Sequence, residues 1–94
     1  MVTLVNNKNY SEVSKMVEFP NLSILMASVS MTKKQLAEII KKAPSAITGK
    51  LSGKRDFKLT EMETITLHFK KIFPERDLTM QYIFCRKGNY SYHE

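Results

Sequence analysis

Two short helical patterns, separated by only three residues, lie in the middle of the chain. In the segment MTKKQLAEII (31–40), Thr32 and Gln35 have the spacing of an N-terminal capping box. Apolar residues with helical spacing follow in both patterns: Leu36, Ile39 and Ile40 in the first, and Ile47 and Leu51 in the second. The first pattern ends at Lys41, and Pro44 is suited to the first turn of the next helix. The spacing therefore predicts two short helices joined by a tight turn.

Helical spacing of apolar residues also occurs on both sides of this pair. It predicts helices in residues 21–29 and 60–73, and Thr60 and Glu63 have the spacing of another capping box. Residues 78–85 favour one more short helix, although a strand is also compatible with them. We therefore expect an all-α fold, a compact bundle of about five short helices.

The length of 94 residues fits one small domain. We place this domain at residues 21–85, with an N-terminal arm or short helix at 1–20 and a C-terminal tail at 86–94. Within it, the segment SGKRDF (52–57) has the composition of a loop, and we expect Phe57 to pack back into the core.

The positive charge is concentrated in one part of the chain. The formal net charge is +6, and residues 1–30 and 59–94 are each neutral when their charged side chains are counted. The whole excess lies in residues 31–58, which carry eight basic and two acidic side chains. A local surplus of this kind attracts polyanions, whereas a solvated basic face with no partner is the simpler alternative.

Several classes of function lack their sequence signals. The chain has no Gly-rich phosphate loop, no Cys/His metal spacing and no paired-carboxylate motif, so we expect no enzyme activity, catalytic residue, metal or cofactor. No apolar run approaches the roughly 20 residues that span a bilayer, and no secretory signal is evident, so we expect no membrane partner. His68 is expected at the edge of the core, and the single cysteine, Cys85, fits a reducing cytoplasm.

The segment MTKKQLAEIIKKAPSAITGKLSGKRDFKL (31–59) resembles the helix-turn-helix of the lambda-repressor-like (XRE) family, especially its small phage repressors. The matching features are Thr32 as the cap, Leu36 and Ala37 in the first helix, Ile47 ten residues after Ala37, and the L-x-G-K-R-x-F loop at 51–57. The resemblance extends over residues 21–85 and implies the compact helical bundle of that family.

The turn between the two helices departs from the family pattern. Lys41 stands where the family commonly has glycine, and a left-handed backbone conformation costs a lysine about 1 kcal/mol. Lys42 stands where an apolar residue is usual, with Ala43 as a weak substitute, and Pro44 replaces the common glutamine. We therefore expect distortion in this turn.

The resemblance implies that the second helix, residues 44–51, lies in the major groove of DNA. The expected base contacts are Ser45, Thr48, Pro44 and Gly49. The expected phosphate contacts are Lys33, Lys34, Lys42, Lys50, Ser52, Lys54 and Arg55. The base-facing set lacks Arg, Asn and Gln. We therefore expect modest direct readout of bases, and we expect backbone contacts and DNA shape to contribute a larger share of the recognition.

The resulting expectation is a sequence-specific, double-stranded DNA-binding regulator of the phage repressor type, in the cytoplasm of a bacterial host. It is expected to act as a homodimer on a two-fold-related operator, with MQYIFC (80–85) or MVTLV (1–5) as candidate interfaces. The alternative is a protein-binding module on the same scaffold, such as an antirepressor or an inhibitor of a host defence protein.

Overall fold

A computed structural model of the chain describes residues 18–87, and these residues form five α-helices and no β-strand. The helices are α2 (Pro20–Ser28), α3 (Lys33–Ile40), α4 (Pro44–Leu51), α5 (Leu59–Ile72) and α6 (Met80–Ile83). This confirms the predicted all-α bundle of short helices. Most of the predicted N-terminal arm and C-terminal tail falls in residues 1–17 and 88–94, outside the described residues.

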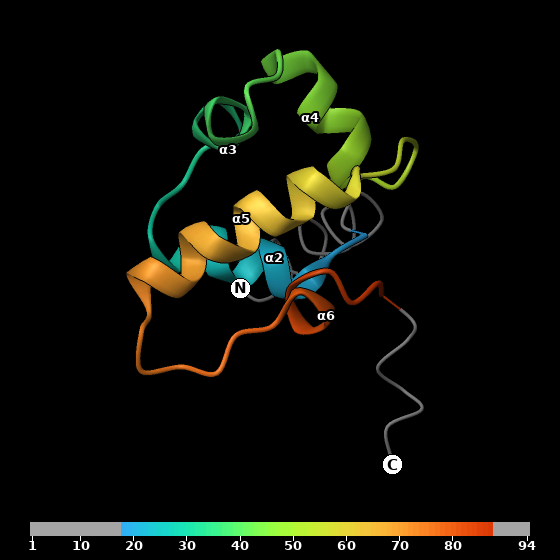
Figure 1. Ribbon diagram of the computed structural model, residues 1–94. Coiled ribbons are helices and arrows are strands. Elements are labelled where there is room, and N and C mark those ends of the chain that lie inside the picture. Colours follow the sequence, from blue (N-terminus) through green and yellow to red (C-terminus); the bar gives the residue numbers. More distant parts are fainter. Residues whose placement is uncertain (1–17, 88–94) are drawn as a thin grey trace, which may run out of the picture.

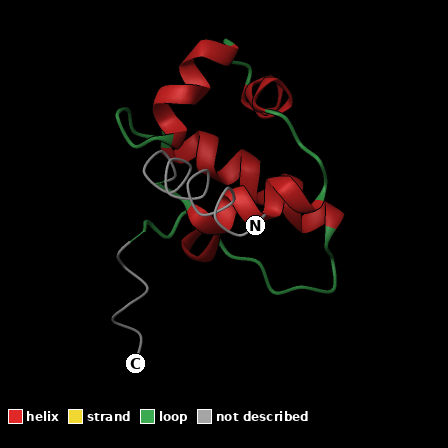
Figure 2. Ribbon diagram, turned by 180° about the vertical axis from the view of Figure 1, so that it is seen from behind, coloured by secondary structure: helices red, strands yellow, loops and turns green. Residues whose placement is uncertain are grey.

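The longest helix, α5, crosses the middle of the molecule. The α3–α4 pair lies on one side of α5, while α2 and α6 lie on the other, and the view from behind shows the same order (Figures 1 and 2). The loop from α5 to α6 passes around the end of the bundle that is farthest from α4 (Figure 1). The α3–α4 pair is therefore displayed at one end of the fold, supported by α5.

The core is formed by apolar side chains from all five helices. The largest side chains that are fully buried are Leu22 and Leu25 of α2, Leu36 of α3, Ile47 of α4, Ile65 and Phe69 of α5, and Ile83 of α6. Ala37 is also fully buried, so α3 presents a small residue where α4 comes close. Since each helix is too short to be stable alone, this shared burial is what stabilises the bundle.

Two of the predicted helix starts can be compared with the structure. The Thr32–Gln35 capping box is confirmed, because Gln35 N–H donates to Thr32 Oγ1 (3.1 Å) and Thr32 N–H donates to Gln35 Oε1 (2.9 Å). The predicted box of Thr60 and Glu63 is wrong. The helix α5 begins at Leu59, and the carboxylate that folds back belongs to Glu61, whose Oε1 accepts the Lys58 N–H at 2.9 Å.

The predicted helix at 78–85 is confirmed as the single turn of α6. Its Ile83 is fully buried and Tyr82 is exposed, so this segment both fills the core and presents an aromatic ring to solvent. Phe84, which follows α6, packs edge-on against Phe19 and Phe57, with ring centroids 5.7 and 5.1 Å apart. Phe57 is thus part of the core, as predicted, and it holds the loop after α4 against the start and the end of the domain.

Candidate nucleic-acid interface

The turn between α3 and α4 consists of residues 41–43 and closes regularly. Lys41 has φ 59° and ψ 48°, the left-handed conformation that glycine would adopt most easily. Its N–H donates to Glu38 O (3.2 Å), and the Lys42 N–H donates to Ala37 O (2.9 Å). The predicted distortion of the turn is therefore absent, because the lysine backbone takes the conformation itself.

The helix α4 lies with one side in the core and the other toward solvent. Of the four residues predicted to contact bases, Pro44, Ser45 and Thr48 are exposed and Gly49 is half-buried. On the opposite side Ile47 is fully buried. The outward face of α4 thus carries only small side chains, and its backbone is open to close approach by a partner.

Gly49 is half-buried because Arg55, from the loop that follows α4, lies against it. A Cβ atom placed on Gly49 would lie 3.5 Å from both Cγ and Cδ of Arg55. The Arg55 N–H also donates to Gly49 O at 3.1 Å, so the loop returns onto the helix. This return brings a guanidinium stem to the outward face of α4, and helical spacing alone gave no signal of it.

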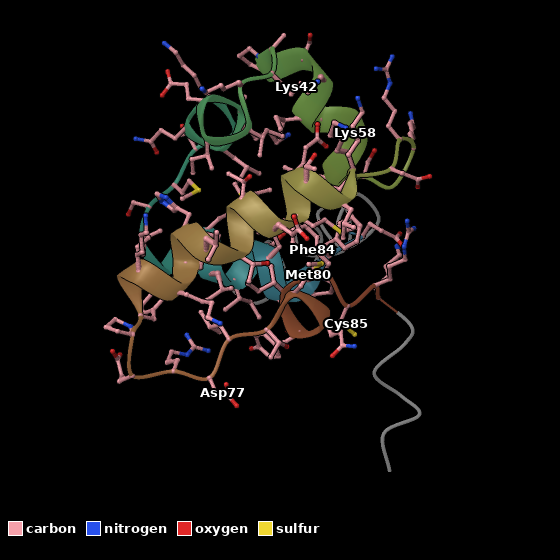
Figure 3. All side chains as sticks on the ribbon, viewed as in Figure 1. Lys42, Lys58, Asp77, Met80, Phe84 and Cys85 are labelled. Carbon is pink, nitrogen blue, oxygen red and sulfur yellow. The ribbon has the colours of Figure 1, made fainter. Side chains whose placement is uncertain are left out.

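Most of the residues predicted to contact phosphate are exposed. Lys33, Lys34, Lys42, Lys54 and Arg55 are exposed. Figure 3 labels Lys42 beside the start of α4 and Lys58, which is also exposed, near its end. Ser52 is half-buried, and its hydroxyl donates to Gly49 O at 3.1 Å. The turn before α4 and the loop after it therefore bring exposed basic side chains to the two ends of α4, while Lys33 and Lys34 lie at the start of α3.

Lys50 is the predicted phosphate contact that the structure places elsewhere. It is only 7% exposed, and its Nζ donates to Glu61 Oε1 (2.9 Å) and to Asp56 O (3.0 Å). The predicted surface position is wrong, because Lys50 follows Ile47 by three residues and so lies on the inward face of α4. The spacing from Ile47 could have predicted the inward position of Lys50. It could not have predicted that the partner of Lys50 is Glu61, eleven residues away.

Glu61 links the turn, α4 and α5 electrostatically. Burial by itself raises the pKa of Glu61, but hydrogen bonds from the Lys50 ammonium and the Lys58 N–H, with the charges of Lys50 and Lys42, outweigh it and hold the pKa below its usual 4.5. The Lys42 ammonium lies 3.8 Å from Glu61 Oε2, an atom that is buried and accepts no hydrogen bond from the described residues. The ionised carboxylate thereby fixes the start of α5 beneath α4.

An apolar groove lies between α3 and the second half of α5. It has a volume of about 430 Å³, and its apolar lining comes from Val29, Met31, Ile39 and Ile72. His68 is half-buried at this groove, next to Glu38 and Gln35. Residues 18–87 contain no cluster of His, Cys, Asp and Glu that could hold a metal ion. None of the helices in this range has the length and apolar character needed to cross a bilayer.

In comparisons with known proteins, no family model, no curated protein and no solved structure matches the chain significantly. The function is therefore inferred from the geometry of α3, the turn, α4 and the loop that follows. These elements combine an outward helix face of small side chains with exposed basic residues at its border. Such a combination suits a partner that is negatively charged and has a groove wide enough for a helix.

Proposed function

We propose that the chain binds double-stranded DNA in a sequence-specific way and acts as a phage-type transcriptional regulator in the cytoplasm of a bacterial host. In this proposal α3, the turn and α4 are a helix-turn-helix of the lambda-repressor-like kind, and α4 enters the major groove. The observation that carries the proposal is the outward face of α4, which has small side chains and is flanked by exposed basic residues of the turn before it and the loop after it.

In this proposal, different side chains contact the phosphates and the bases. Lys33, Lys34, Lys42 and Lys54 neutralise phosphates on either side of the groove, and this term is independent of sequence. The hydroxyls of Ser45 and Thr48 donate to or accept from base edges, and the Thr48 methyl group suits the thymine methyl. Since neither side chain makes a bidentate contact, DNA shape and deformability supply a large share of the specificity.

A mobility-shift titration with random-sequence and selected duplexes tests this proposal. The double variant Lys54→Gln with Arg55→Gln is expected to weaken binding by about tenfold or more at moderate salt, because two phosphate contacts are lost. The matched control is Lys70→Gln with Lys71→Gln, which removes the same charge from exposed residues in the last turn of α5. The control is expected to retain most of the affinity.

Two results would contradict the proposal. One is the absence of duplex binding by the wild-type chain even at low salt. The other is an equal loss of affinity in the two double variants. This would mean that net charge alone attracts DNA and that α4 is not the binding element. Lys50 is not a useful position for this test, because its ammonium is buried on Glu61 and its replacement would damage the fold.

We propose further that two copies bind one two-fold-related site, because a single small domain covers little DNA. Of the two candidate interfaces, residues 80–85 contribute the exposed ring of Tyr82, while Ile83 is buried in the core. The other candidate, residues 1–5, lies outside the described residues. Sedimentation of the chain with a duplex that carries one or two half-sites measures the stoichiometry directly.

A protein-binding module is the second candidate function, and the apolar groove beside α3 favours it. A groove lined by Val29, Met31 and Ile39 suits a helix or loop of a partner protein. The same titration separates the two functions. A protein that binds no duplex, but whose complex with a protein partner is broken by Ile39→Asp, would support this second function.

A further inference from the structure

The two ends of the described chain meet at the loop that follows α4. Glu18 and Arg86 lie 68 residues apart in sequence, yet their side chains form an ion pair, with 3.0 Å between Oε2 and NH1. In Figures 1 and 2 the beginning and the end of the described chain lie on the same side of the molecule as the loop between α4 and α5. These are the residues just outside the predicted domain at 21–85.

The backbone of Glu18 connects the end of α4 with the C-terminal segment. Its N–H donates to Leu51 O at 3.2 Å, and its carbonyl accepts the Lys87 N–H at 2.8 Å. Leu51 is the last residue of α4, where helix carbonyls lack partners within the helix. Glu18 therefore satisfies part of the end of α4 while it is itself held by the C-terminal segment.

The side chains of the pair pack on the loop. Gly53 has φ 86°, and a Cβ atom there would lie only 3.0 Å from Glu18 Cγ, so the Glu18 side chain fills the space above the glycine. The Arg86 guanidinium lies 5.2 Å from the centre of the Phe19 ring and reaches Asp56 Oδ1 at 3.4 Å. Because Asp56 is 90% exposed, that last pair contributes little by itself.

The basic residues Lys54 and Arg55 lie between these anchors. On the inner side, the Arg55 N–H is bonded to Gly49 O, and Asp56 O accepts from the buried Lys50 ammonium. On the outer side, Glu18 and Arg86 reach Gly53 and Asp56 of the loop. The backbone is thus held both before and after the two residues, while their own side chains point to solvent.

We propose that Glu18 and Arg86 are positioning residues for DNA binding. Their ion pair holds the loop 53–56 against α4, so that Lys54 and Arg55 meet the phosphate backbone without a further cost of ordering the loop. This inference rests on the proposed DNA-binding function. It also gives the residues at the edges of the domain a part in recognition, through the loop that they hold.

The variant Glu18→Gln tests the proposal by whether its affinity for DNA rises or falls. It removes a negative charge, so simple electrostatics predicts tighter DNA binding, whereas loss of the ion pair loosens the loop and predicts weaker binding by about fivefold. The matched control is Glu75→Gln, an exposed residue in the loop after α5, which changes the net charge equally and is expected to bind as tightly as the wild type or more tightly. Tighter binding by Glu18→Gln would overturn the proposal.

A second pair of variants removes positive charge instead. Arg86→Gln is expected to lower the affinity by about fivefold, and Arg76→Gln by much less. Arg76 is a close control, since its guanidinium stacks on Phe73 at 5.3 Å much as Arg86 stacks on Phe19. Equal losses in these two variants would mean that only the charge matters, and would also overturn the proposal.

Hydrogen exchange in the free, full-length protein gives a readout that does not depend on DNA. Glu18→Gln and Arg86→Gln are expected to speed exchange of the Arg55 amide by about fivefold or more, with the α5 amides unchanged, because only the loop is released. Uniform acceleration of all amides, or none at Arg55, would refute the positioning role. If the wild-type chain binds no duplex, the proposed function fails, yet this exchange measurement still decides whether the pair holds the loop.

Discussion

Lys41 has a strained backbone conformation, at the position where the sequence pattern favours glycine. It occupies the left-handed region, φ 59°, at the end of α3, where a side chain with a Cβ is disfavoured by about 1 kcal/mol. The strain is tolerated because the N–H groups of Lys41 and Lys42 close the helix end on Glu38 O and Ala37 O. A lysine at this position places a positive charge near the start of α4, which a glycine would not.

Replacing this lysine by glycine tests that account. Lys41→Gly is expected to raise the free energy of unfolding by roughly 0.5–1 kcal/mol, because glycine adopts the left-handed conformation without strain. Denaturant unfolding followed by circular dichroism measures the change. Lys41→Ala is the control: it removes the same charge but keeps the Cβ atom. An equal gain in both variants would assign the effect to charge rather than to the backbone.

The element that carries the proposed function, α4, is short and poorly capped. It begins at Pro44, its N-cap residue Ala43 makes no side-chain hydrogen bond, and it contains a glycine in its second half. Such a helix has little stability of its own, and burial of Ile47 and Lys50 holds it in place. Gly49 lies toward the outward side of α4, where the Arg55 side chain covers the position that a Cβ atom would take.

Gly49→Ala separates stability from binding. Helix propensity predicts that the variant is more stable by up to about 1 kcal/mol, and the 3.5 Å spacing to Arg55 leaves room for a methyl group. The affinity for a selected duplex is expected to stay close to that of the wild type, because the methyl group lies against the Arg55 side chain, which already covers this position. Thermal unfolding and mobility-shift titration measure the two effects. A marked loss of affinity would contradict this account and indicate close approach of DNA at Gly49.

At the scale of the whole molecule, the charges around α4 and the start of α5 form an outer and an inner set. The outer set contains the exposed lysines and arginine around α4. The inner set is the buried pair of Lys50 and Glu61, with Lys42 at its edge. A buried pair of this kind need not add net stability, but removing one partner is costly because the other charge is left without compensation. The stability of the bundle therefore depends on the ionisation of Glu61.

The pH dependence of unfolding tests whether the stability of the bundle depends on the ionisation of Glu61. Because the pKa of Glu61 is lowered in the folded state, its stabilising contribution is present above the usual value of 4.5 and is lost as the pH falls through the folded-state pKa. Glu61→Gln is expected to be less stable than the wild type by about 3 kcal/mol at roughly pH 6, and the difference is expected to shrink toward about pH 3. Glu63→Gln, on the exposed side of α5, is the control and should show no such trend. A difference that is constant with pH would contradict the assignment.

The parts of the fold that sequence reasoning recovered are those governed by neighbours along the chain. The Thr32–Gln35 box and the helix start at Pro44 involve residues within one turn, so their spacing was enough to predict them. The N-cap of α5 was misplaced by two residues, because threonine is a better N-cap residue than lysine, although Thr60 and Lys58 both stand three residues before a glutamate. Glu61 took the role because its carboxylate is also bound by Lys50.

The sequence by itself determined the helix pattern, the apolar core positions and the concentration of positive charge in residues 31–58. These follow from short-range spacing and from composition, which every conformation of the chain shares. Only the tertiary structure decided which lysines are free to meet a partner, since burial of Lys50 depends on the distant Glu61. It also decided that Arg55 lies on Gly49 and that Glu18 and Arg86 hold the loop, because contacts between separate segments exist only once the helices have packed.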